Sequence, residues 1–473
     1  MSCPTYTNPS RTRRTVVELA VEQTPGCLRT KGYEQILLYE NFNPLQPEFD
    51  TIKLNRARNG LAPEGTAIGL GTYRISGSIY MFGSGIPNVS PAWAKVLRAC
   101  GWKETRWVMD TAPTVALNDV TAVGDITGGN MAAGTYKYKF SIIPATASNG
   151  ETKLSAMSQT PGTGAAADGG IVASGSTGKV TLDWSACTAL KAAGVVVRIY
   201  RTKLGGSVFY YLTEVDGDVA PYQYVDTWID DNLAELEPTE DAAKEYCEWV
   251  PANETHDSLS ILSFLDSRKY PASGVRGTMT FAGDAAQPFK GDFNLQGVYN
   301  NSTQEANDTP LSTPGFPPRL LDIGLTITKA GGGSYTPVVK NIGLNLGANV
   351  TARLDANADS GVIEYGIFEE FAPRFTCQIE VDGAKDWIGH FKDGDKFLVD
   401  YLVSPSGAGS TAGTRFSIKV GDDPNGGTAY GAQLITAPQF DDSNGVRVFN
   451  LEFEPSEVDS AQTTGKFIYF KQY

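Results

Sequence analysis

The feature that most constrains the fold of this chain is an order of strand, short helix and later strand that occurs twice. In the first occurrence, GTYRISGSIYMFG alternates apolar and polar residues, and NVSPAWAKVLRACGW follows it. Alternation with a period of two predicts a half-buried strand, whereas apolar residues at i, i+3, i+4 and i+7 predict a helix with one buried stripe. Trp93, Val96, Leu97 and Cys100 have this helical spacing.

The second occurrence lies near residue 380. There RFTCQIEVDG predicts a strand, and AKDWIGHFKDGD predicts a helix centred on Trp387. Both helices have recognisable ends. Ser90 and Pro91 are residue types that begin helices, whereas Gly101 and Gly394 suit the position just past a helix end. The apolar face of the second strand is expected to hold Phe375, Cys377, Ile379 and Val381.

Each helix is followed by a strand-like segment that contains Phe-Asn-Leu, at residues 293–295 and 449–451. From Trp93 to Phe293 is 200 residues, but from Trp387 to Phe449 is only 62. Removing the 128 residues of 114–241 from the first interval leaves 72, which is close to the second interval. The spacing therefore predicts a duplicated fold whose first copy is interrupted by an inserted module.

Residues 114–241 differ in character from their surroundings. They contain strand-like runs such as AAGTYKYKFSIIPA, GVVVRIYRT and SVFYYLTEV, separated by turn residues at the spacing of a seven-stranded sandwich. The predicted organisation is mainly β, with a first copy in two segments, 1–113 and 242–312, the insertion at 114–241, and a second copy at 313–473. Each copy is expected to open with two strands, TVVELAV and DTIKLNR in the first, LLDIGLTI and VVKNIGLNL in the second.

Charge and composition exclude several classes of protein. The chain carries 39 Lys and Arg against 53 Asp and Glu, a net charge of −14, so it lacks the basic surface that grips nucleic acid by its phosphates. Its six cysteines are widely scattered and are expected to be reduced. The N-terminal sequence has no apolar core of a signal peptide, and no membrane-spanning run is present, so we expect synthesis in a cytoplasm without membrane anchoring.

At SGSIYMFGSGIPNVSPAWAKVLRACGW and VRGTMTFAGDAAQPFKGDFNLQGVY the chain resembles the tail tube proteins of long, flexible-tailed bacteriophages, which are the major tail proteins of these virions. The second copy, with its Trp387 helix and FNLEFEP strand, is similar to the C-terminal portion of the family. The resemblance implies tandem β-sandwich folds, each with a flanking helix, whose inner strands join those of neighbouring subunits into a barrel-forming ring. Rings of this kind stack into a hollow tail tube of the virion.

The resemblance also implies partners and a role. Family members with one fold per chain form hexamers, so a duplicated chain is expected to form a homotrimer with a pseudo-hexameric ring, and hexamers remain the alternative. The other expected partners are the tape measure, terminator and tail-tip proteins of the virion. DNA would pass transiently through the lumen during ejection into the host cell, and an acidic lumen would repel its phosphates. No cofactor, metal or enzymatic activity is implied.

The insertion resembles the immunoglobulin-like and fibronectin-like domains carried by phage structural proteins, and it is expected on the outside of the tube, because a module of this size would block the lumen. Contacts between stacked rings are expected from the turn-rich segment 40–66, although an ordinary surface loop is an equal alternative. The candidate contacts there are Phe42, Leu45, Phe49, Arg56, Arg58 and Leu61. The expected core anchors of the duplicated fold are Trp93, Leu97, Phe293, Leu295, Trp387, Phe391, Phe449 and Leu451.

Other interpretations remain open. DANADSG at 355–361 has the alternating oxygen ligands of a calcium loop, but the glycine and the twelfth residue do not fit, so a polar turn is expected. His256 and His390 lie in no Ser or Cys nucleophile motif, so catalysis is not expected, and His390 in the predicted Trp387 helix is expected to have a packing or surface role. A terminator or tail-tip ring would share the fold without forming long tubes. A secreted β-sandwich binding protein is the alternative from a different class, and the absence of a signal peptide disfavours it.

Overall fold

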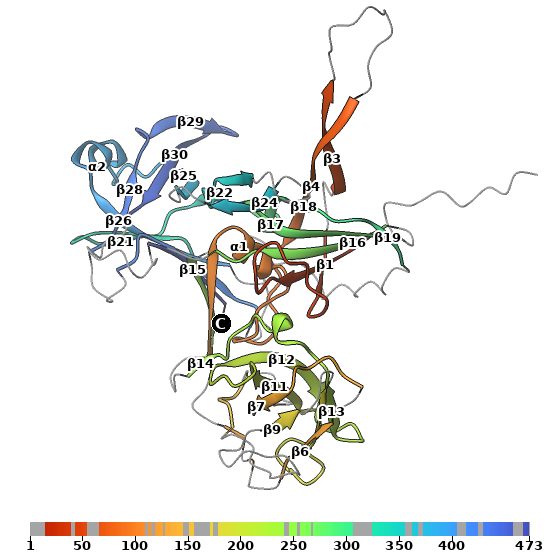
Figure 1. Cartoon of the computed structure of the whole chain (residues 1–473). Coiled ribbons are helices and arrows are strands. Elements are labelled where there is room, and N and C mark those ends of the chain that lie inside the picture. Colours follow the sequence, from red (N-terminus) through yellow and green to blue (C-terminus); the bar gives the residue numbers. More distant parts are fainter. Residues whose placement is uncertain are drawn as a thin grey trace, which may run out of the picture.

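The computed structural model shows a mainly β protein with antiparallel sheets, two short α-helices and one separately packed module (Figure 1). No helix in the described part of the chain is long and apolar enough to cross a membrane. The structure describes residues 15–38, 43–53, 66–108, 112–113, 115, 119–125, 128–144, 151–155, 171–173, 178–240, 246–252, 256–265, 268–305, 324–354, 362–367, 372–403, 413–423, 429–456 and 467–472.

The central feature is a continuous row of eight antiparallel strands. In order, the row contains β3 (Asn43–Lys53), β4 (Thr66–Tyr80), β18 (Lys290–Tyr299), β17 (Arg268–Asp284), β22 (Val339–Asn345), β25 (Arg374–Glu380), β30 (Val446–Pro455) and β29 (Gln439–Ser443). We call this row the eight-stranded sheet. Its first four strands come from the segments predicted as the first copy and its last four from the predicted second copy, so the two halves meet at the β17–β22 pairing.

The two halves of the eight-stranded sheet have the same internal order. Phe293 on β18 lies opposite Gly77 of β4 and Met279 of β17. On β30, Phe449 lies opposite Ile379 of β25 and Phe440 of β29. Each Phe-Asn-Leu strand therefore has the same two kinds of neighbour. One is the strand that comes before a helix, β4 or β25, and the other is its hairpin partner, β17 or β29. The two Phe-Asn-Leu segments thus occupy the same place in their own half of the eight-stranded sheet.

A second layer covers the apolar face of the eight-stranded sheet. One part pairs β2 (Glu34–Ile36), β1 (Thr15–Val21), β16 (Leu259–Leu265) and the first half of β17. The other part pairs β14 (Thr239–Glu240), β5 (Trp102–Val108), β15 (Tyr246–Pro251), β31 (Ile468–Gln472), β27 (Phe416–Val420), β26 (Lys396–Val403), β20 (Thr326–Lys329) and β21 (Ser334–Tyr335). Three shorter connections complete the body: β28 (Ala432–Leu434) pairs with β26 and β30, β19 (Thr303–Gln304) with β17, and β23 (Val350–Leu354) with β24 (Val362–Ile367).

The strands expected to open each copy do not pair with each other. In the described residues β1 pairs with β2 and β16, and β3 pairs with β4. Likewise β20 pairs with β21 and β26, and β22 with β17 and β25. In each predicted copy, one of the two opening strands therefore lies in the second layer and the other in the eight-stranded sheet. The apolar faces of the two layers are buried against each other in one core.

The helices α1 (Ala94–Ala99) and α2 (Trp387–Asp393) occur where the sequence predicts them. Gly101 and Gly394 take positive φ values of 85° and 67°, as expected for residues at a helix end. The prediction that Ser90 caps the first helix is wrong. The helix begins at Ala94 after a tighter turn, and Ser90 Oγ instead donates a hydrogen bond of 3.0 Å to Glu104 Oε2 of β5. That hydroxyl therefore fixes the loop before α1 to the second layer.

Residues between β5 and β14 form a module with its own hydrophobic core, separate from the core of the body. Trp184, Phe140 and Ile199 are among the buried residues of this second core. The module contains β6 (Thr121–Asp125), β7 (Gly134–Tyr136), β8 (Tyr138–Ile143), β9 (Ile171–Ala173), β10 (Lys179–Asp183), β11 (Val196–Thr202), β12 (Phe209–Asp216), β13 (Gln223–Asp226) and the 3₁₀ helix η3 (Asp230–Asn232). Its strands pair as β13–β10–β6, β12–β11–β8 and β7–β9.

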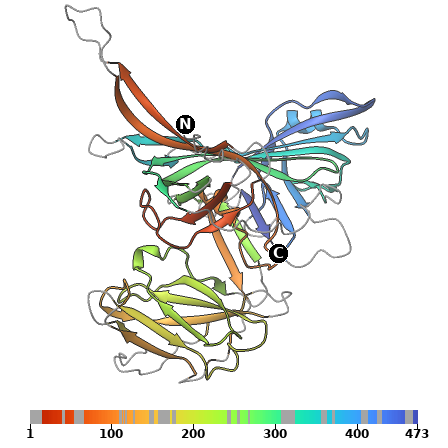
Figure 2. The same cartoon turned by 90° about the vertical axis from the view of Figure 1, so that its right-hand side faces the viewer.

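The module lies on one side of the body, and the β3–β4 hairpin projects from the opposite side (Figures 1 and 2). Seen as in Figure 2, the order from top to bottom is the eight-stranded sheet, the second layer and the module. The second layer therefore separates the module from the eight-stranded sheet.

Candidate assembly surfaces

The two faces of the eight-stranded sheet differ sharply in chemistry. Successive side chains of a strand point to opposite faces. On one face Tyr73, Ile75, Met279 and Phe281 are at most 2% exposed and belong to the core of the body. The residues between them on the same strands face the other way. We call that other side the polar face.

The polar face is rich in amide and hydroxyl side chains. Amides and hydroxyls hydrogen-bond water and carry no net charge, so they offer no strong attachment to a charged polymer. Across the row of strands this face presents Ser76, Thr278, Thr280, Asn294, Gln296, Asn345, Thr376, Gln378, Asn450 and Gln439. Gln378 Nε2 donates to Asn450 Oδ1 at 2.9 Å, which links two of these strands.

Basic side chains of the polar face lie beside carboxylates. Arg374 Nη1 lies 3.1 Å from Glu452 Oε1, and Arg74 Nε lies 3.3 Å from Glu48 Oε2. Lys340 Nζ, at the start of β22, binds Glu380 Oε1 at 2.6 Å. The face also carries Asp284, Asp292 and Asp441. By the same register Arg276 and Lys290 also lie on this face, so its acidic groups exceed its basic ones only slightly.

The eight-stranded sheet ends in two edge strands. In the part of the chain that the structure describes, β3 pairs only with β4, and β29 pairs only with β30. A strand edge presents unpaired backbone N–H and C=O groups, which form a template for another strand. Both edges carry large exposed apolar side chains, Phe49 on β3 at 44% and Phe440 on β29 at 58%.

The β3–β4 hairpin contains part of the segment expected to contact a neighbouring ring. Its two strands extend away from the body (Figure 2), which brings Phe49 to an exposed position. The backbone of Leu45 lies in β3, but its side chain lies outside the described part of the structure. Phe42, Arg56, Arg58 and Leu61 also lie outside the described residues.

The expected core anchors are placed as follows. Trp93 lies between the two halves of the body, with its ring centroid 6.4 Å from that of Phe281 and 5.6 Å from that of Phe416. Its indole Nε1 donates to the carbonyl oxygen of Phe82 at 2.7 Å. Trp387 packs on Phe397 at 5.8 Å within the second half. Leu97, Phe293, Leu295, Phe449 and Leu451 are at most 4% exposed, and Phe391 is partly buried against the same core.

The module is joined to the body by a buried carboxylate that sequence reasoning missed. Glu151 has a fully buried side chain, and its Oε2 lies 3.0 Å from Arg198 Nη1 of the module and 3.3 Å from Arg106 Nη1 of β5. Tyr200 and Ser141 donate hydroxyl hydrogen bonds to its Oε1. Despite burial, which opposes ionisation, the guanidinium groups and hydrogen bonds hold the pKa of Glu151 below its ordinary value.

A second charged contact joins the module to α1. Lys95 Nζ lies 2.9 Å from Glu235 Oε1 of the module and 3.1 Å from Glu34 Oε1 of β2. Arg98 on the same helix lies 2.7 Å from Asp257 and 3.9 Å from Glu235. The two cations hold the pKa of Glu235 well below its ordinary value. The helix predicted from Trp93 therefore uses its apolar stripe in the core and its basic residues to hold the module.

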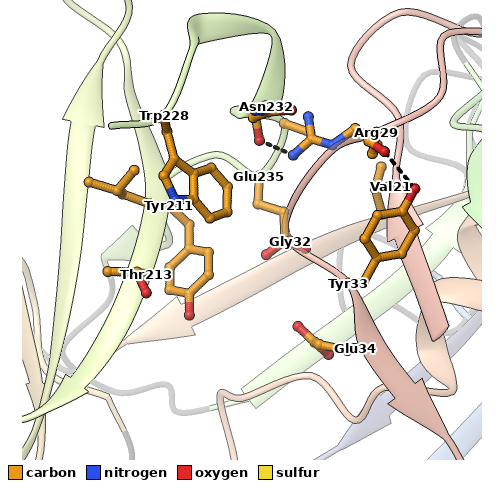
Figure 3. A pocket seen from close by; sticks show the side chains of 12 residues that line it. Val21, Arg29, Gly32, Tyr33, Glu34, Tyr211, Thr213, Trp228, Asn232 and Glu235 are labelled. Carbon is orange, nitrogen blue, oxygen red and sulfur yellow. Dashed lines mark hydrogen bonds between the residues drawn. The ribbon is translucent and has the colours of Figure 1, made fainter. Parts of the chain in front are cut away.

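A pocket of about 160 Å³ lies at the seam between module and body (Figure 3). Its charged groups already have structural partners. Arg29 Nη1 donates to the carbonyl oxygen of Asp231 at 2.7 Å, and its Nη2 donates to that of Asn232. The carboxylates of Glu34 and Glu235 both bind Lys95. We interpret the pocket as part of the joint. Its lining includes Arg29, Tyr33, Glu34, Tyr211, Trp228 and Glu235.

Two other predicted features can be placed. His256 Nε2 lies 3.0 Å from the carbonyl oxygen of Ala252, and burial lowers the pKa of its imidazole. His390 on α2 pairs with Asp395 at 2.7 Å. Both histidines therefore contact groups that lie within five residues of them in the sequence. The loop 355–361, considered as a calcium ligand, lies outside the described residues.

Comparison with known proteins identifies no relative: no family model matches the chain, and no curated protein matches its sequence. The candidate assembly surface is therefore defined by the structure alone, as the eight-stranded sheet with its polar face and its two edge strands.

Proposed function

We propose that this chain is a structural subunit that assembles through its eight-stranded sheet into rings, and that the rings stack into a hollow tail tube of a phage virion. The observation that carries the proposal is the sheet itself. It is built from two similar halves, it is apolar on the side of the core, and most side chains on its other side are polar. Its two edge strands present unpaired backbone groups that can pair with another chain.

Repetition of the two halves supports a closed ring. The β17–β22 pairing shows that one half continues into the next by ordinary antiparallel pairing. Further copies added at β3 and β29 would extend the same sheet around an axis. Three chains would supply six halves, which is the trimeric form of a pseudo-sixfold ring. A hexamer of chains would supply twelve halves and a wider channel.

The chemistry of the polar face supports transit of DNA through the channel. If this face lines the lumen, a passing duplex meets amides, hydroxyls and an excess of carboxylates. Three of its basic groups are paired with carboxylates, as Arg374 is with Glu452. Attachment to phosphates grows with each unpaired cation, so pairing them favours movement. The module then lies outside the tube, because the second layer separates it from this face.

Electron microscopy of the purified full-length chain tests this function. We expect rings or long hollow tubes in negative stain, with the module as a projection on the outer surface. Rings that never stack would favour a terminator or tail-tip component over a tube. Monomers at all concentrations, measured by sedimentation velocity, would contradict the proposed assembly.

A further inference from the structure

The exposed phenylalanines at the two sheet edges have buried counterparts inside the chain. Phe440 is 58% exposed on β29, and Phe49 is 44% exposed on β3. At the internal β17–β22 junction, Met279 and Leu346 are both fully buried in the body core. The backbone N–H of Leu346 donates to the carbonyl oxygen of Met279 at 3.2 Å, which extends the ladder between the two halves.

Phe440 occupies the position of Met279. Met279 lies opposite Phe293 in the first half, and Phe440 lies opposite Phe449 in the second half. Phe293 and Phe449 begin the two Phe-Asn-Leu segments and occupy the same place between their neighbouring strands. Strand β29 is therefore the second half's version of β17, and its outer side corresponds to the side of β17 on which β22 lies.

Phe49 occupies the position of Leu346. Counting from the Phe-Asn-Leu strands, Tyr73 of β4 corresponds to Phe375 of β25, since they lie opposite Gly297 and Phe453. Pro47 lies opposite Tyr73, as Leu344 lies opposite Phe375. Two residues further along each strand stand Phe49 and Leu346 respectively. Strand β3 is therefore the first half's version of β22.

We propose that β29 of one copy pairs with β3 of a second copy in the register of the β17–β22 junction, so that Phe49 of one copy covers Phe440 of the other. This interaction rests on the proposed function and specifies how neighbouring chains join within a ring. The matching register places Asp441 opposite Glu48, as Thr280 lies opposite Asn345, and Ser443 opposite Gln46, as Ala282 lies opposite Gly343. Phe49 thus acts between neighbours in one ring rather than between stacked rings.

The occupant of these edges must be a second copy rather than the same chain. The edges are separated by the full width of the eight-stranded sheet. Neighbouring strands lie about 4.8 Å apart, so the seven spacings place β3 and β29 roughly 34 Å apart along the row. The two edges are complementary because each has a counterpart in the internal junction. An exposed aromatic on each edge supplies apolar area that pairing would bury.

Disulfide cross-linking tests the register while keeping both phenylalanines. One chain carries Glu48→Cys and a second carries Asp441→Cys, each with Cys3→Ser and Cys27→Ser so that the exposed native thiol is absent. Directly opposed residues have Cβ atoms about 5 Å apart, within reach of a disulfide. We expect a covalent dimer of the two chains after mixing and mild oxidation, and none from either chain alone. The matched control replaces Glu48→Cys with Leu354→Cys, because Leu354 is 69% exposed on β23, outside both edge strands.

A second measurement tests whether assembly buries the phenyl side chains of Phe49 and Phe440. Phe440→Ser and Phe49→Ser are each expected to raise the concentration needed for assembly at least about tenfold, while Val225→Ser, which alters an exposed valine of the module, leaves it unchanged. Circular dichroism checks that all three remain folded. If rings form but neither the cross-link nor the serine effect appears, this register is wrong and the proposed function stands. If the unsubstituted chain forms no assembly, both proposals fail.

Discussion

Single buried charges decide how the module is attached. Glu151 faces two guanidinium groups in a site without solvent access, so its ionised form compensates both Arg106 and Arg198. Removing one partner of a buried pair leaves the remaining charge uncompensated, which costs far more than losing an exposed ion pair. Glu214 offers the comparison within the same group, since it lies 3.2 Å from Arg198 but its side chain is 50% exposed.

Replacing Glu151 is therefore expected to destabilise the joint strongly. Glu151→Gln keeps the size of the side chain but removes its charge, and we expect the free energy of unfolding to fall by about 3–5 kcal/mol. The matched variant Glu214→Gln should lower it by less than about 1 kcal/mol. Urea denaturation followed by circular dichroism measures both, and equal effects would contradict the assigned role of Glu151.

The same residue predicts a pH dependence. Because the folded protein holds the pKa of Glu151 below its unfolded value of about 4.5, its contribution is present above that pH. It is lost as the pH falls through the lower pKa of the folded state. The stability difference between the natural chain and Glu151→Gln should therefore be full at pH 7 and should shrink below about pH 4.5.

At the scale of elements, local patterns in the sequence were sufficient where neighbours along the chain decide the structure. The strand around Tyr73, the Trp93 helix and the Gly394 helix end are all set by periodicity or by a local backbone conformation. Ser90 is not the cap because the helix begins only at Ala94, and its hydroxyl instead donates to Glu104 on the next strand.

Contacts between distant segments could not be predicted in this way. The β17–β22 pairing joins strands that no local pattern relates, and the polar face emerges only when strands from both halves lie together. Glu151 lies in the ordinary turn-like run NGETKL, and nothing in its sequence neighbours indicates Arg106 or Arg198 as partners. Because the two Phe-Asn-Leu segments are equivalent, the strands of one half can be matched with those of the other, and β29 and β3 are matched with β17 and β22.

The proposed register makes a prediction about charge on the edge strands. Asp441 would face Glu48 across the junction, and like charges directly opposite each other destabilise strand pairing by about 0.2–1 kcal/mol. Asp441→Asn is therefore expected to lower the concentration needed for assembly by about 1.4-fold to fivefold. Sedimentation velocity at low ionic strength measures this change.

The control for this charge variant is Asp393→Asn, which removes the same charge from an exposed position of α2, outside both edge strands. It should leave assembly nearly unchanged. Salt provides a second check, since screening shortens the reach of exposed charges and should reduce the advantage of Asp441→Asn. An equal gain from both variants would mean that net charge, rather than the facing of Asp441 and Glu48, controls assembly.

At the scale of the whole molecule, the body and the module are each stabilised by a separate hydrophobic core. The fully buried members of the body core come from outside the module, and the module core lies wholly within it. Buried ion pairs join the module to the body, and a pocket lies between them at one end of this joint (Figure 3). A molecule built in this way can lose the module without opening the body core, provided that the chain can be rejoined.

The structure shows where the chain can be rejoined after the module is deleted. Strands β5 and β15 form an antiparallel pair in which Trp107 lies opposite Tyr246, so replacing residues 109–244 with Asn-Gly would close them as a tight hairpin. Lys95 and Arg106 then become exposed to water rather than buried without partners, unlike the Glu151→Gln variant. We expect a folded body that still forms rings, because neither edge of the eight-stranded sheet is altered. Sedimentation velocity and electron microscopy measure assembly, and rings thinner at the outer surface would support an external module. Loss of rings by a folded deletion variant would show that the module takes part in joining the chains.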